Sequence, residues 1–347
     1  PGTIDAGDRL NLVIRAGAGV NTIAVDYAAE KGVFVCNTPG RNAVAVAELA
    51  MGLILAIDRN IPDQVADLRH GKWDKKRYSK TNGLAGRTLG IIGLGAIGFE
   101  VAKRANAFDM QLAAYDPYLA PDRAEALKQM GARIEKDTVA LAASCDILTV
   151  HVPAMAGTDG LISKKLLEAV KPGTVIINTS RGSIIDEEAL LEAMETKGVR
   201  AGLDVYQGEP GAGANTFEST LAGHPSVYGT HHIGASTDQA QTAIADAVVE
   251  SLAAFQSGSP LNCVNLGSVT GTEQTVTIRH HNVVGVLAGV LSTLREAGIN
   301  VEHMENFVLA GRAAASAVIH VIGEVSPATV AKLESVDNVI AVSVNSR

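Results

Sequence analysis

The chain has few aromatic residues and no long apolar run. Only 4% of its 347 residues are Phe, Trp or Tyr, whereas 35 are glycine and 47% are apolar. This composition is typical of a glycine-turned α/β protein whose cores are filled by Val, Ile, Leu and Ala, and the length favours two or three domains. Because no stretch of about 18 apolar residues occurs, the sequence predicts no transmembrane helix.

An excess of positive charge and paired cysteines are also missing. The net charge is −8, which argues against a nucleic-acid partner or an anionic membrane surface. Cys36, Cys145 and Cys263 are scattered, odd in number and without C-x-x-C spacing. We therefore expect reduced thiols in a cytoplasmic protein.

A glycine-rich turn stands between an apolar strand and a helical segment. The stretch GIIGLGAIG carries Gly93, Gly95 and Gly98 as G-x-G-x-x-G. In this context the first glycine makes a tight turn, the second admits a pyrophosphate to the backbone and the third lets helix and strand pack closely. Asp116 follows at the end of the next strand, where a carboxylate can accept both ribose hydroxyls and repel a 2′-phosphate. The sequence therefore predicts NAD as the cofactor.

Other polar residues follow later strands of the same alternating pattern. Arg181 comes after the apolar segment TVIIN, and Asp204 and Glu209 come at the end of GLDVY and in the loop after it. His231 and His232 follow SVYGT, and their spacing alone does not decide between them. Ligands of open α/β sheets bind beyond such strand ends. We expect Asp204 to meet a nicotinamide carboxamide.

These residue types suit hydride transfer between a dinucleotide and a small 2-hydroxy acid. A guanidinium can hold the substrate carboxylate with two parallel hydrogen bonds. A histidine can exchange a proton with the reacting oxygen, and a neighbouring carboxylate favours its charged form. Arg181, Glu209 and one of the two histidines supply all three groups.

Several motifs, taken in order, resemble the D-2-hydroxyacid dehydrogenase family. They are RAGAGVNTIAVDYAAEKGV, NTPGRNAVAVAEL, GIIGLGAIG, NTSRGSIIDEEAL, LDVYQGEP and HIGAST. The resemblance implies an NAD-dependent dehydrogenase in which Arg181, Glu209 and His232 are catalytic, and it leaves His231 as a loop residue.

The same resemblance implies further contacts to cofactor and substrate. The cofactor-binding residues are expected to be Gly93, Gly95, Ala96, Ile97, Gly98, Asp116, His151, Val152, Pro153, Thr179, Ser180, Asp204, His232 and Gly234. The substrate, a phosphorylated 2-hydroxy acid, is expected to meet Arg15, Ala16, Gly17, Asn42, Arg181 and His232. It is also expected to meet Trp73 and Lys76, on a basic arm that in the family crosses to the partner subunit.

The expected fold is α/β, with a doubly wound Rossmann-like parallel sheet, a partial flavodoxin-like substrate domain and a C-terminal βαββαβ domain. We place the substrate domain at 1–82, completed by 234–258, and the NAD domain at 83–233. A Gly/Pro/Ser-marked linker covers 259–271 and the small domain 272–347. The chain begins at Pro1 and reaches a strand within about ten residues, so we expect the first part of the substrate domain to be missing.

The C-terminal domain resembles an ACT domain, a module that pairs and binds amino acids. The resemblance implies an L-serine effector at His280, Asn282 and Asn300. A purely structural pairing role stays open for this domain. The apolar helical region 43–57 and the basic arm predict a homodimer. Pairing of the C-terminal domains would then make a homotetramer.

Two other classes of function stay open for the whole chain. One is a dehydrogenase of glyoxylate, hydroxypyruvate or D-lactate, and the other is a nucleotide-sensing interaction protein. A metal site is not expected, because neither His-His pair has a cysteine or carboxylate at ligand spacing and no H-E-x-x-H motif occurs.

Overall fold

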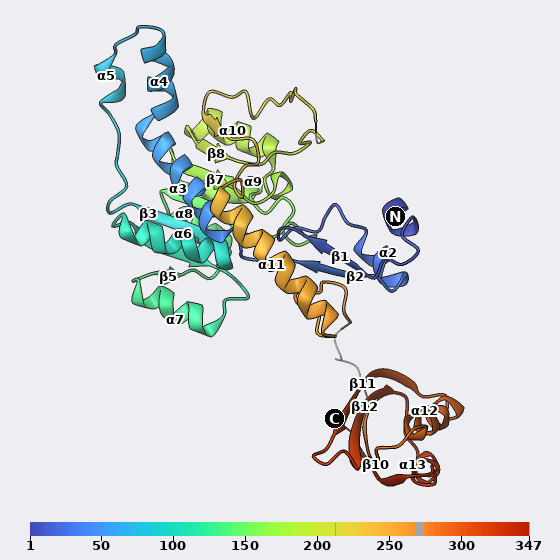
Figure 1. The fold of residues 1–347 in the computed structure, drawn as a ribbon. Coiled ribbons are helices and arrows are strands. Elements are labelled where there is room, and N and C mark those ends of the chain that lie inside the picture. The colour runs from blue at the N-terminus through green and yellow to red at the C-terminus, as the bar shows by residue number, and fades with distance from the viewer. Residues whose placement is uncertain (212, 268–273, 347) are drawn as a thin grey trace. The chain divides into compact units, whose positions relative to one another are not determined.

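The computed structural model describes residues 1–211, 213–267 and 274–346 (Figure 1). The chain divides into two compact units, Pro1–Asn265 and Leu266–Arg347. The division falls inside the predicted linker 259–271. Residues 268–271 of that linker, and residues 272, 273 and 347 of the predicted small domain, lie outside the described residues.

The large unit is built on a seven-stranded sheet in which all strands are parallel. The strand order is β5-β4-β3-β6-β7-β8-β9, which is the doubly wound arrangement with its switch point between β3 and β6. The predicted Rossmann-like sheet is therefore confirmed. The strands are β3 (Thr88–Ile92), β4 (Gln111–Tyr115), β5 (Arg133–Ile134), β6 (Ile147–Val150), β7 (Val175–Asn178), β8 (Arg200–Leu203) and β9 (Val227–Gly229).

Helices cover both faces of this sheet, and each face has its own apolar core. One face carries α3 (Ala43–Arg59), α6 (Ala96–Ala107) and α7 (Pro121–Gln129), and the other carries α8 (Thr138–Ser144), α9 (Lys164–Ala169) and α10 (Glu187–Lys197). The alternating pattern of the sequence does not predict α8. The apolar character of α3 is explained within the chain, since nine of its residues are buried.

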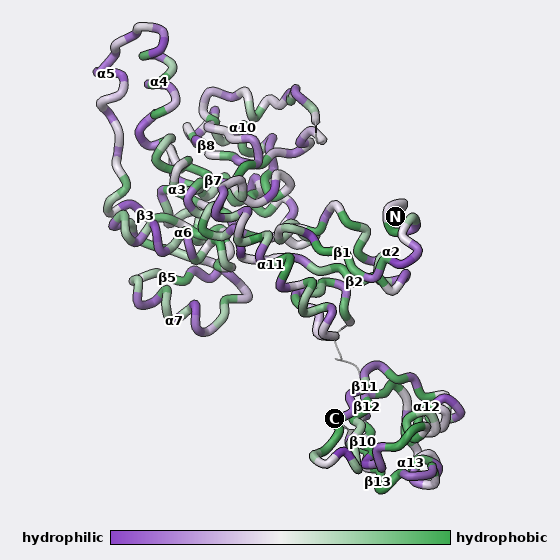
Figure 2. Tube along the Cα trace, in the orientation of Figure 1, coloured by the Kyte–Doolittle hydropathy of each residue, from purple (hydrophilic) through white to green (hydrophobic). Residues whose placement is uncertain are grey.

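An arm extends from the end of α3. It consists of α4 (Ile61–Arg69) and α5 (Lys75–Tyr78), and Figure 2 shows it as largely hydrophilic. The break between α3 and α4 lies at Asn60, two residues before Pro62, where a φ of 49° ends α3 in a left-handed cap. Pro62 stands in the first turn of α4, where a missing N–H costs nothing.

The rest of the large unit is a two-stranded parallel sheet with its helices. These elements are α1 (Gly2–Asp5), β1 (Leu12–Arg15), α2 (Val25–Glu30), β2 (Phe34–Asn37) and α11 (Asp238–Gln256). Phe34 packs edge-on against Phe255 of α11. Cys263, which follows α11 in the chain, forms an antiparallel bridge with Cys36 of β2. Part of the predicted linker is therefore docked on this sheet.

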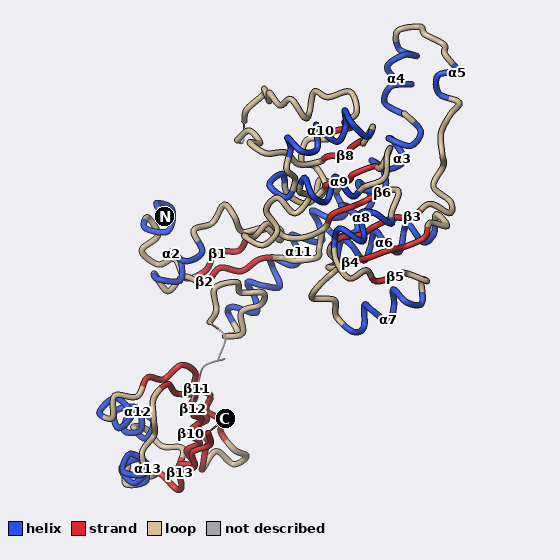
Figure 3. The backbone as a smooth tube through the Cα atoms, turned by 180° about the vertical axis from the view of Figure 1, so that it is seen from behind, coloured by secondary structure: helices blue, strands red, loops and turns tan. Residues whose placement is uncertain are grey.

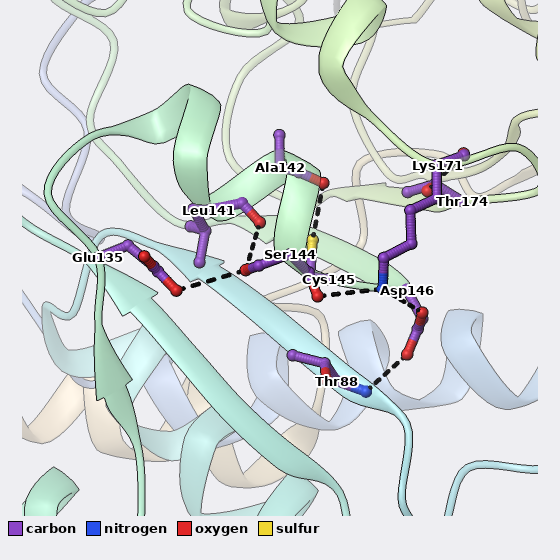
Figure 4. Close-up of polar contacts among 9 residues, drawn as sticks. All are labelled: Thr88, Glu135, Leu141, Ala142, Ser144, Cys145, Asp146, Lys171 and Thr174. Atoms are coloured by element: carbon purple, nitrogen blue, oxygen red, sulfur yellow. Dashed lines mark hydrogen bonds and ion pairs between the residues drawn. The ribbon is translucent and has the colours of Figure 1, made fainter.

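At the amino edge of the large sheet, one carboxylate ties several elements together (Figure 4). Asp146 accepts hydrogen bonds from Thr88 N at 2.9 Å and from Lys171 Nζ at 2.8 Å. The same lysine donates to the Ser144 carbonyl oxygen at 3.1 Å. These contacts fasten the starts of β3 and β6 to the loop before β7.

The small unit has the order βαββαβ, with α12 and α13 on one side of an antiparallel sheet (Figure 3). Its elements are β10 (Gln274–His281), α12 (Val286–Glu296), β11 (Asn300–Val308), β12 (Ala314–Ile322), α13 (Pro327–Glu334) and β13 (Val339–Ser346), in the sheet order β11-β12-β10-β13. Among all described residues, no helix is long and apolar enough to cross a bilayer.

Candidate functional site

The glycine-rich turn has the backbone geometry that a dinucleotide needs. Gly93 has φ of 86°, and a Cβ there would lie 2.7 Å from the His151 carbonyl oxygen. A Cβ at Gly98 would lie 2.0 Å from the Gly93 oxygen, whereas a Cβ at Gly95 would meet nothing within 4 Å. The first and third glycines are thus required by packing. The second faces open space at the start of α6, where a pyrophosphate could approach the helix N-terminus.

A cavity of about 710 Å³ lies beside this turn, at the carboxyl edge of β3, β4 and β6. Asp116 lines it, and its two oxygens accept hydrogen bonds from Leu94 N at 2.7 Å and Tyr118 N at 2.8 Å. These bonds hold the carboxylate in one orientation and leave lone pairs for ribose hydroxyls. The lining also includes Gly93, Gly95, His151, Val152 and Pro153 of the predicted contacts.

Two buried polar atoms near this cofactor region lack hydrogen-bond partners among the described residues. They are Nδ1 of His151 and Oγ1 of Thr179, which follow β6 and β7. Burial lowers the pKa of His151 to about 3, so its ring is neutral. Unpaired polar atoms are costly inside a protein, and a bound polar ligand would satisfy them. The neighbouring Ser180 hydroxyl is already used, since it donates to the Val150 oxygen at 2.8 Å.

Histidine and glutamate meet at the carboxyl edge of β8 and β9. Nδ1 of His232 lies 2.6 Å from Oε2 of Glu209, and Tyr206 N donates to Oε1 at 3.0 Å. A carboxylate only accepts hydrogen bonds, so Nδ1 carries a proton and Nε2 is left for proton exchange. His231 is exposed beside it.

The carboxylate of Asp204 fixes the loop that carries this histidine. Asp204 is 1% exposed, and its oxygens accept hydrogen bonds from Thr230 Oγ1 at 2.6 Å, Ile233 N at 2.8 Å and Gly234 N at 2.9 Å. Its carbonyl oxygen accepts from His232 N at 2.8 Å. These bonds support the left-handed φ of 54° at His232. Sequence reasoning missed this positioning role, because loop hydrogen bonds leave no spacing pattern.

Arg181 lies where loops from two parts of the large unit meet. It precedes the short 3-10 helix η1 (Gly182–Ile184), whose first residue packs directly on the Tyr206 backbone. Nη1 of Arg181 donates to the Ser180 oxygen at 2.6 Å. Its Nη2 lies against Gly19, where a Cβ would come within 2.2 Å of it. The structure therefore brings Arg181 next to the loop after β1.

That loop holds the predicted substrate contacts of the first strand. Arg15 donates to the oxygens of Ala16, at 2.6 Å, and Gly19, at 3.2 Å. Thr38 makes two hydrogen bonds with Gly17. Its Oγ1 accepts from Gly17 N at 2.8 Å, and its backbone N donates to the Gly17 oxygen at 3.0 Å. A carboxylate would replace the carbonyl partners of the guanidinium with a stronger, charged acceptor.

The remaining predicted contacts at the start of α3 and α6 lie next to one another. Gly40 approaches α6 so closely that a Cβ there would lie 3.5 Å from the Ala96 Cβ. Asn42 is the N-cap of α3, in the same loop. Ile97 is the second residue of α6.

Within this chain, Trp73 and Lys76 are not part of the site. The arm that carries them starts where α3 ends, and Arg200 at the amino end of β8 bonds Ile57 and Asn60 there. The other end of α3, about 25 Å away over its 17 residues, adjoins the carboxyl edge. The arm therefore does not reach the site of its own chain, and the expected contact with substrate in a partner subunit stays a prediction. Trp73 is 82% exposed.

The three predicted effector residues do not meet in one small unit either. His280 pairs with Ala315 of β12, which pairs with Val308 at the far end of β11 from Asn300. Eight residues of strand separate Asn300 from Val308, roughly 25 Å. Within a single chain the three residues therefore do not form one site, and the expected L-serine site stays a prediction.

The partners of these effector residues differ as well. His280 is buried and its Nε2 lies 3.1 Å from Asn306 Oδ1, while Asn282 donates to the Arg312 oxygen at 3.0 Å. Asn300 bonds Glu302. Across the described residues, no group of three or more His, Cys, Asp or Glu side chains is arranged to hold a metal ion.

Comparisons with known proteins agree with this geometry. Residues 51–234 match the family described as D-isomer specific 2-hydroxyacid dehydrogenase, NAD binding domain. A D-3-phosphoglycerate dehydrogenase of Archaeoglobus fulgidus is 41% identical over 77% of this chain and 49% of its own length. A hydroxypyruvate reductase of Thermotoga maritima is 43% identical over 72% of this chain and 78% of its own.

A solved structure shares the arrangement of most of the chain. A glyoxylate reductase from Paecilomyes thermophila superimposes with a TM-score of 0.66 and 33% identity, covering 74% of this chain and 75% of the other. The chain spans about half the length of several curated relatives that it matches. It belongs to the D-isomer specific 2-hydroxyacid dehydrogenases and carries their NAD-binding domain.

Proposed function

We propose that the protein oxidises 3-phospho-D-glycerate to 3-phosphohydroxypyruvate with NAD, the first step of L-serine biosynthesis in the cytoplasm. The observation that carries the proposal is the His232–Glu209 pair at the carboxyl edge of the sheet, on loops that pack against the loop of Arg181. The names of several similar proteins support the choice of substrate.

The proton path follows from the pairing of the two side chains. In the oxidation direction Nε2 of His232 takes the proton of the substrate hydroxyl. Glu209, held by the Tyr206 amide, stabilises the imidazolium that forms. In the reverse direction the same nitrogen returns the proton, and the ring keeps its orientation through Nδ1.

The two arginines bind and orient the acid. Arg181 has donors beyond its bond to Ser180, and Arg15 holds the loop around Gly17 and Gly19. A carboxylate between them would be held by charge-assisted hydrogen bonds, which are stronger and more directional than neutral ones. The hydroxyl carbon then faces the side on which His232 stands.

The dinucleotide site fits NAD. Gly93, Gly95 and Gly98 shape the pyrophosphate turn, Asp116 accepts the ribose hydroxyls, and His151 and Thr179 offer the unpaired polar atoms. When bound, NAD supplies the acceptor for the hydride that leaves the substrate carbon.

The phosphate and the effector both call for a second copy of the chain. Trp73 and Lys76 lie at the opposite edge from the site, so we propose that the partner's arm brings them to the phosphate, in a homodimer or homotetramer. We also propose that the small unit is an ACT domain and that the two-stranded sheet of β1 and β2 is flavodoxin-like. An L-serine site would then combine His280 and Asn282 of one copy with Asn300 from another.

Two alternatives make different predictions for the same assay. Reduction of hydroxypyruvate or glyoxylate is favoured by the relative from Thermotoga maritima, most of whose length is matched. An NAD-sensing interaction protein would bind NADH without turnover, and would leave the His232–Glu209 pair without a use.

The test is a comparison of NADH oxidation by this chain with 3-phosphohydroxypyruvate, hydroxypyruvate and glyoxylate, with and without L-serine. We expect kcat/KM to be at least about tenfold higher for 3-phosphohydroxypyruvate than for the other two acids, because one charged hydrogen bond to the phosphate contributes about that factor. Preference for an unphosphorylated acid would remove the phosphate assignment and keep the catalytic residues. Tight NADH binding without turnover of any acid would favour the sensing protein.

A pair of variants tests the histidine assignment. His232→Ala should lower kcat by about 100- to 10,000-fold and keep NADH affinity, because only the proton transfer is removed. His231→Ala is the matched control, one residue away and exposed, and should keep kcat within about twofold. If the two variants exchanged their effects, the assignment of His232 would be wrong.

A further inference from the structure

Two of the three cysteines face each other across a pair of chain segments. Cys36 is in β2, and Cys263 lies in the segment 262–265 that follows α11. Their backbones form an antiparallel bridge in which Asn37 N donates to the Asn262 oxygen at 3.2 Å and Val264 N donates to the Val35 oxygen at 2.8 Å.

This hydrogen-bond pattern defines the type of pair. Both bonds are made by the flanking residues and neither by the cysteines themselves, so Cys36 and Cys263 form a non-hydrogen-bonded pair. In such pairs the Cα atoms are about 4.5 Å apart and the side chains lie on the same face. That spacing is within the range of roughly 4.4–6.8 Å that disulfides require.

A side chain holds the segment in this register. Asn265 accepts from Val35 N at 2.9 Å through Oδ1, and its Nδ2 donates to the Val33 oxygen at 2.8 Å. The Cys263 thiol donates to the same Oδ1 at 3.2 Å. The segment 262–265 is therefore docked beside β2 through this bridge, which places the two cysteines opposite each other.

The two thiols differ in exposure, which sets the order of reaction. Cys36 is fully buried, and its pKa is raised to about 11 by burial and by the neighbouring Cys263 thiol. Cys263 is partly exposed. Cys145 is buried elsewhere, beside α8, with its thiol directed at the Ala142 oxygen (Figure 4).

We propose that Cys36 and Cys263 are a redox-active pair that forms a reversible disulfide when the protein meets a peroxide. Cys263 reacts first. Its sulfur bonds one oxygen of hydrogen peroxide, the O–O bond breaks, and water leaves with the thiol proton. The Cys36 sulfur then attacks the sulfenic sulfur, the S–O bond breaks, and a second water leaves with the Cys36 proton. The two thiols lose two electrons, and the peroxide gains them.

The position of the pair links this chemistry to the cleft. Cys36 precedes Asn37 and Thr38, which hold the loop after β1 through Ala18 and Gly17. A disulfide would tie β2 to the segment between α11 and the small unit. Because it closes a very long chain loop, it should raise the Tm of the large unit on the order of 10 °C.

The test is peroxide treatment of the reduced full chain, followed by alkylation under denaturing conditions and mass mapping of unreduced peptides. We expect one linked peptide pair containing Cys36 and Cys263, a loss of two hydrogen atoms from the intact mass, and an alkylated Cys145. Dithiothreitol should restore all three thiols. Sulfinic acid at Cys263 without a linked pair, or three free thiols after treatment, would overturn the proposal.

Variants separate the pair from general oxidation. Cys145→Ser should form the disulfide as the wild-type protein does, whereas Cys36→Ser and Cys263→Ser should not. Asn265→Ala keeps every thiol and loosens the docked segment, so it should slow formation of the linked pair several-fold. If Asn265→Ala reacted at the wild-type rate, the register described above would not be what brings the thiols together.

Discussion

Gly182 is the position at which the Arg181 loop and the Glu209 loop touch. A Cβ at this residue would lie 2.0 Å from the carbonyl carbon and 2.1 Å from the oxygen of Tyr206, and 2.5 Å from Gln207 N. All three atoms belong to the backbone, so no flexible side chain can move aside. In Gly182→Ala the two loops must therefore separate by at least about 1 Å to reach ordinary contact distance.

The size of the effect follows from what this backbone carries. Tyr206 N positions the Glu209 carboxylate, which orients His232. A displacement of about 1 Å at a catalytic group can cost roughly 100-fold in rate, and overpacking of a tight contact costs about 1–3 kcal/mol of stability. We expect Gly182→Ala to lower kcat/KM about 100-fold and to destabilise the large unit by about 2 kcal/mol.

Steady-state rates and urea unfolding measure the two effects. The matched control is Gly211→Ala, two residues after Glu209, where a Cβ would meet nothing within 4 Å and φ is not positive. It should change neither quantity by more than about twofold or 0.5 kcal/mol. If Gly182→Ala also kept its rate and stability, the loops would not pack rigidly, and the positioning of Glu209 through Tyr206 would be refuted.

Two further predictions concern buried polar groups near the site. Asp204→Asn should destabilise the large unit by about 1–3 kcal/mol in urea unfolding, because an amide group facing Gly234 N leaves a buried donor unpaired. Its kcat should also fall, because the His232 loop loosens. Unchanged stability would contradict this prediction. Burial lowers the pKa of His151 to about 3 in the folded protein. Between about pH 6.5 and 3, therefore, only the unfolded chain takes up this proton, and the free energy of unfolding decreases as the pH is lowered. Between pH 7 and pH 5 the loss should be about 2 kcal/mol and largely absent in His151→Asn; equal pH dependence of the two proteins in urea unfolding would count against a buried neutral ring.

The parts of the site that the sequence predicts are those with local physical causes. The turn at Gly93, Gly95 and Gly98 follows from strand–helix geometry within a few residues, and the structure has the required close contacts at its first and third glycines. The placement of Arg181, Glu209 and His232 follows from parallel topology, since all three come after adjacent strands. For these residues, chain order and strand direction are enough.

What the sequence does not predict depends on contacts between distant segments. The use of Asp204 as a hydrogen-bond acceptor for a whole loop, and the pairing of Cys36 with Cys263, each join residues that only tertiary structure brings together. The arm depends on a second copy of the chain, because the resemblance assigns it to substrate in a partner subunit and its own chain places it at the other edge of the sheet. The two effector segments at His280 and Asn300 are separated in the same way, by a full strand length.

The low aromatic and high glycine content of the chain has a structural use at this site. Several close contacts of the segments that carry the functional groups are made at glycine. Gly98 lies against the Gly93 backbone, Gly182 against Tyr206 and Gly19 against the Arg181 guanidinium. At the first two, any Cβ would collide with fixed backbone, whereas at Gly19 it would meet only the end of a flexible side chain. The glycine-rich turn and the His232–Glu209 pair are therefore held by rigid contacts, while the Arg181 guanidinium keeps the freedom to adjust that the proposed binding of an acid requires.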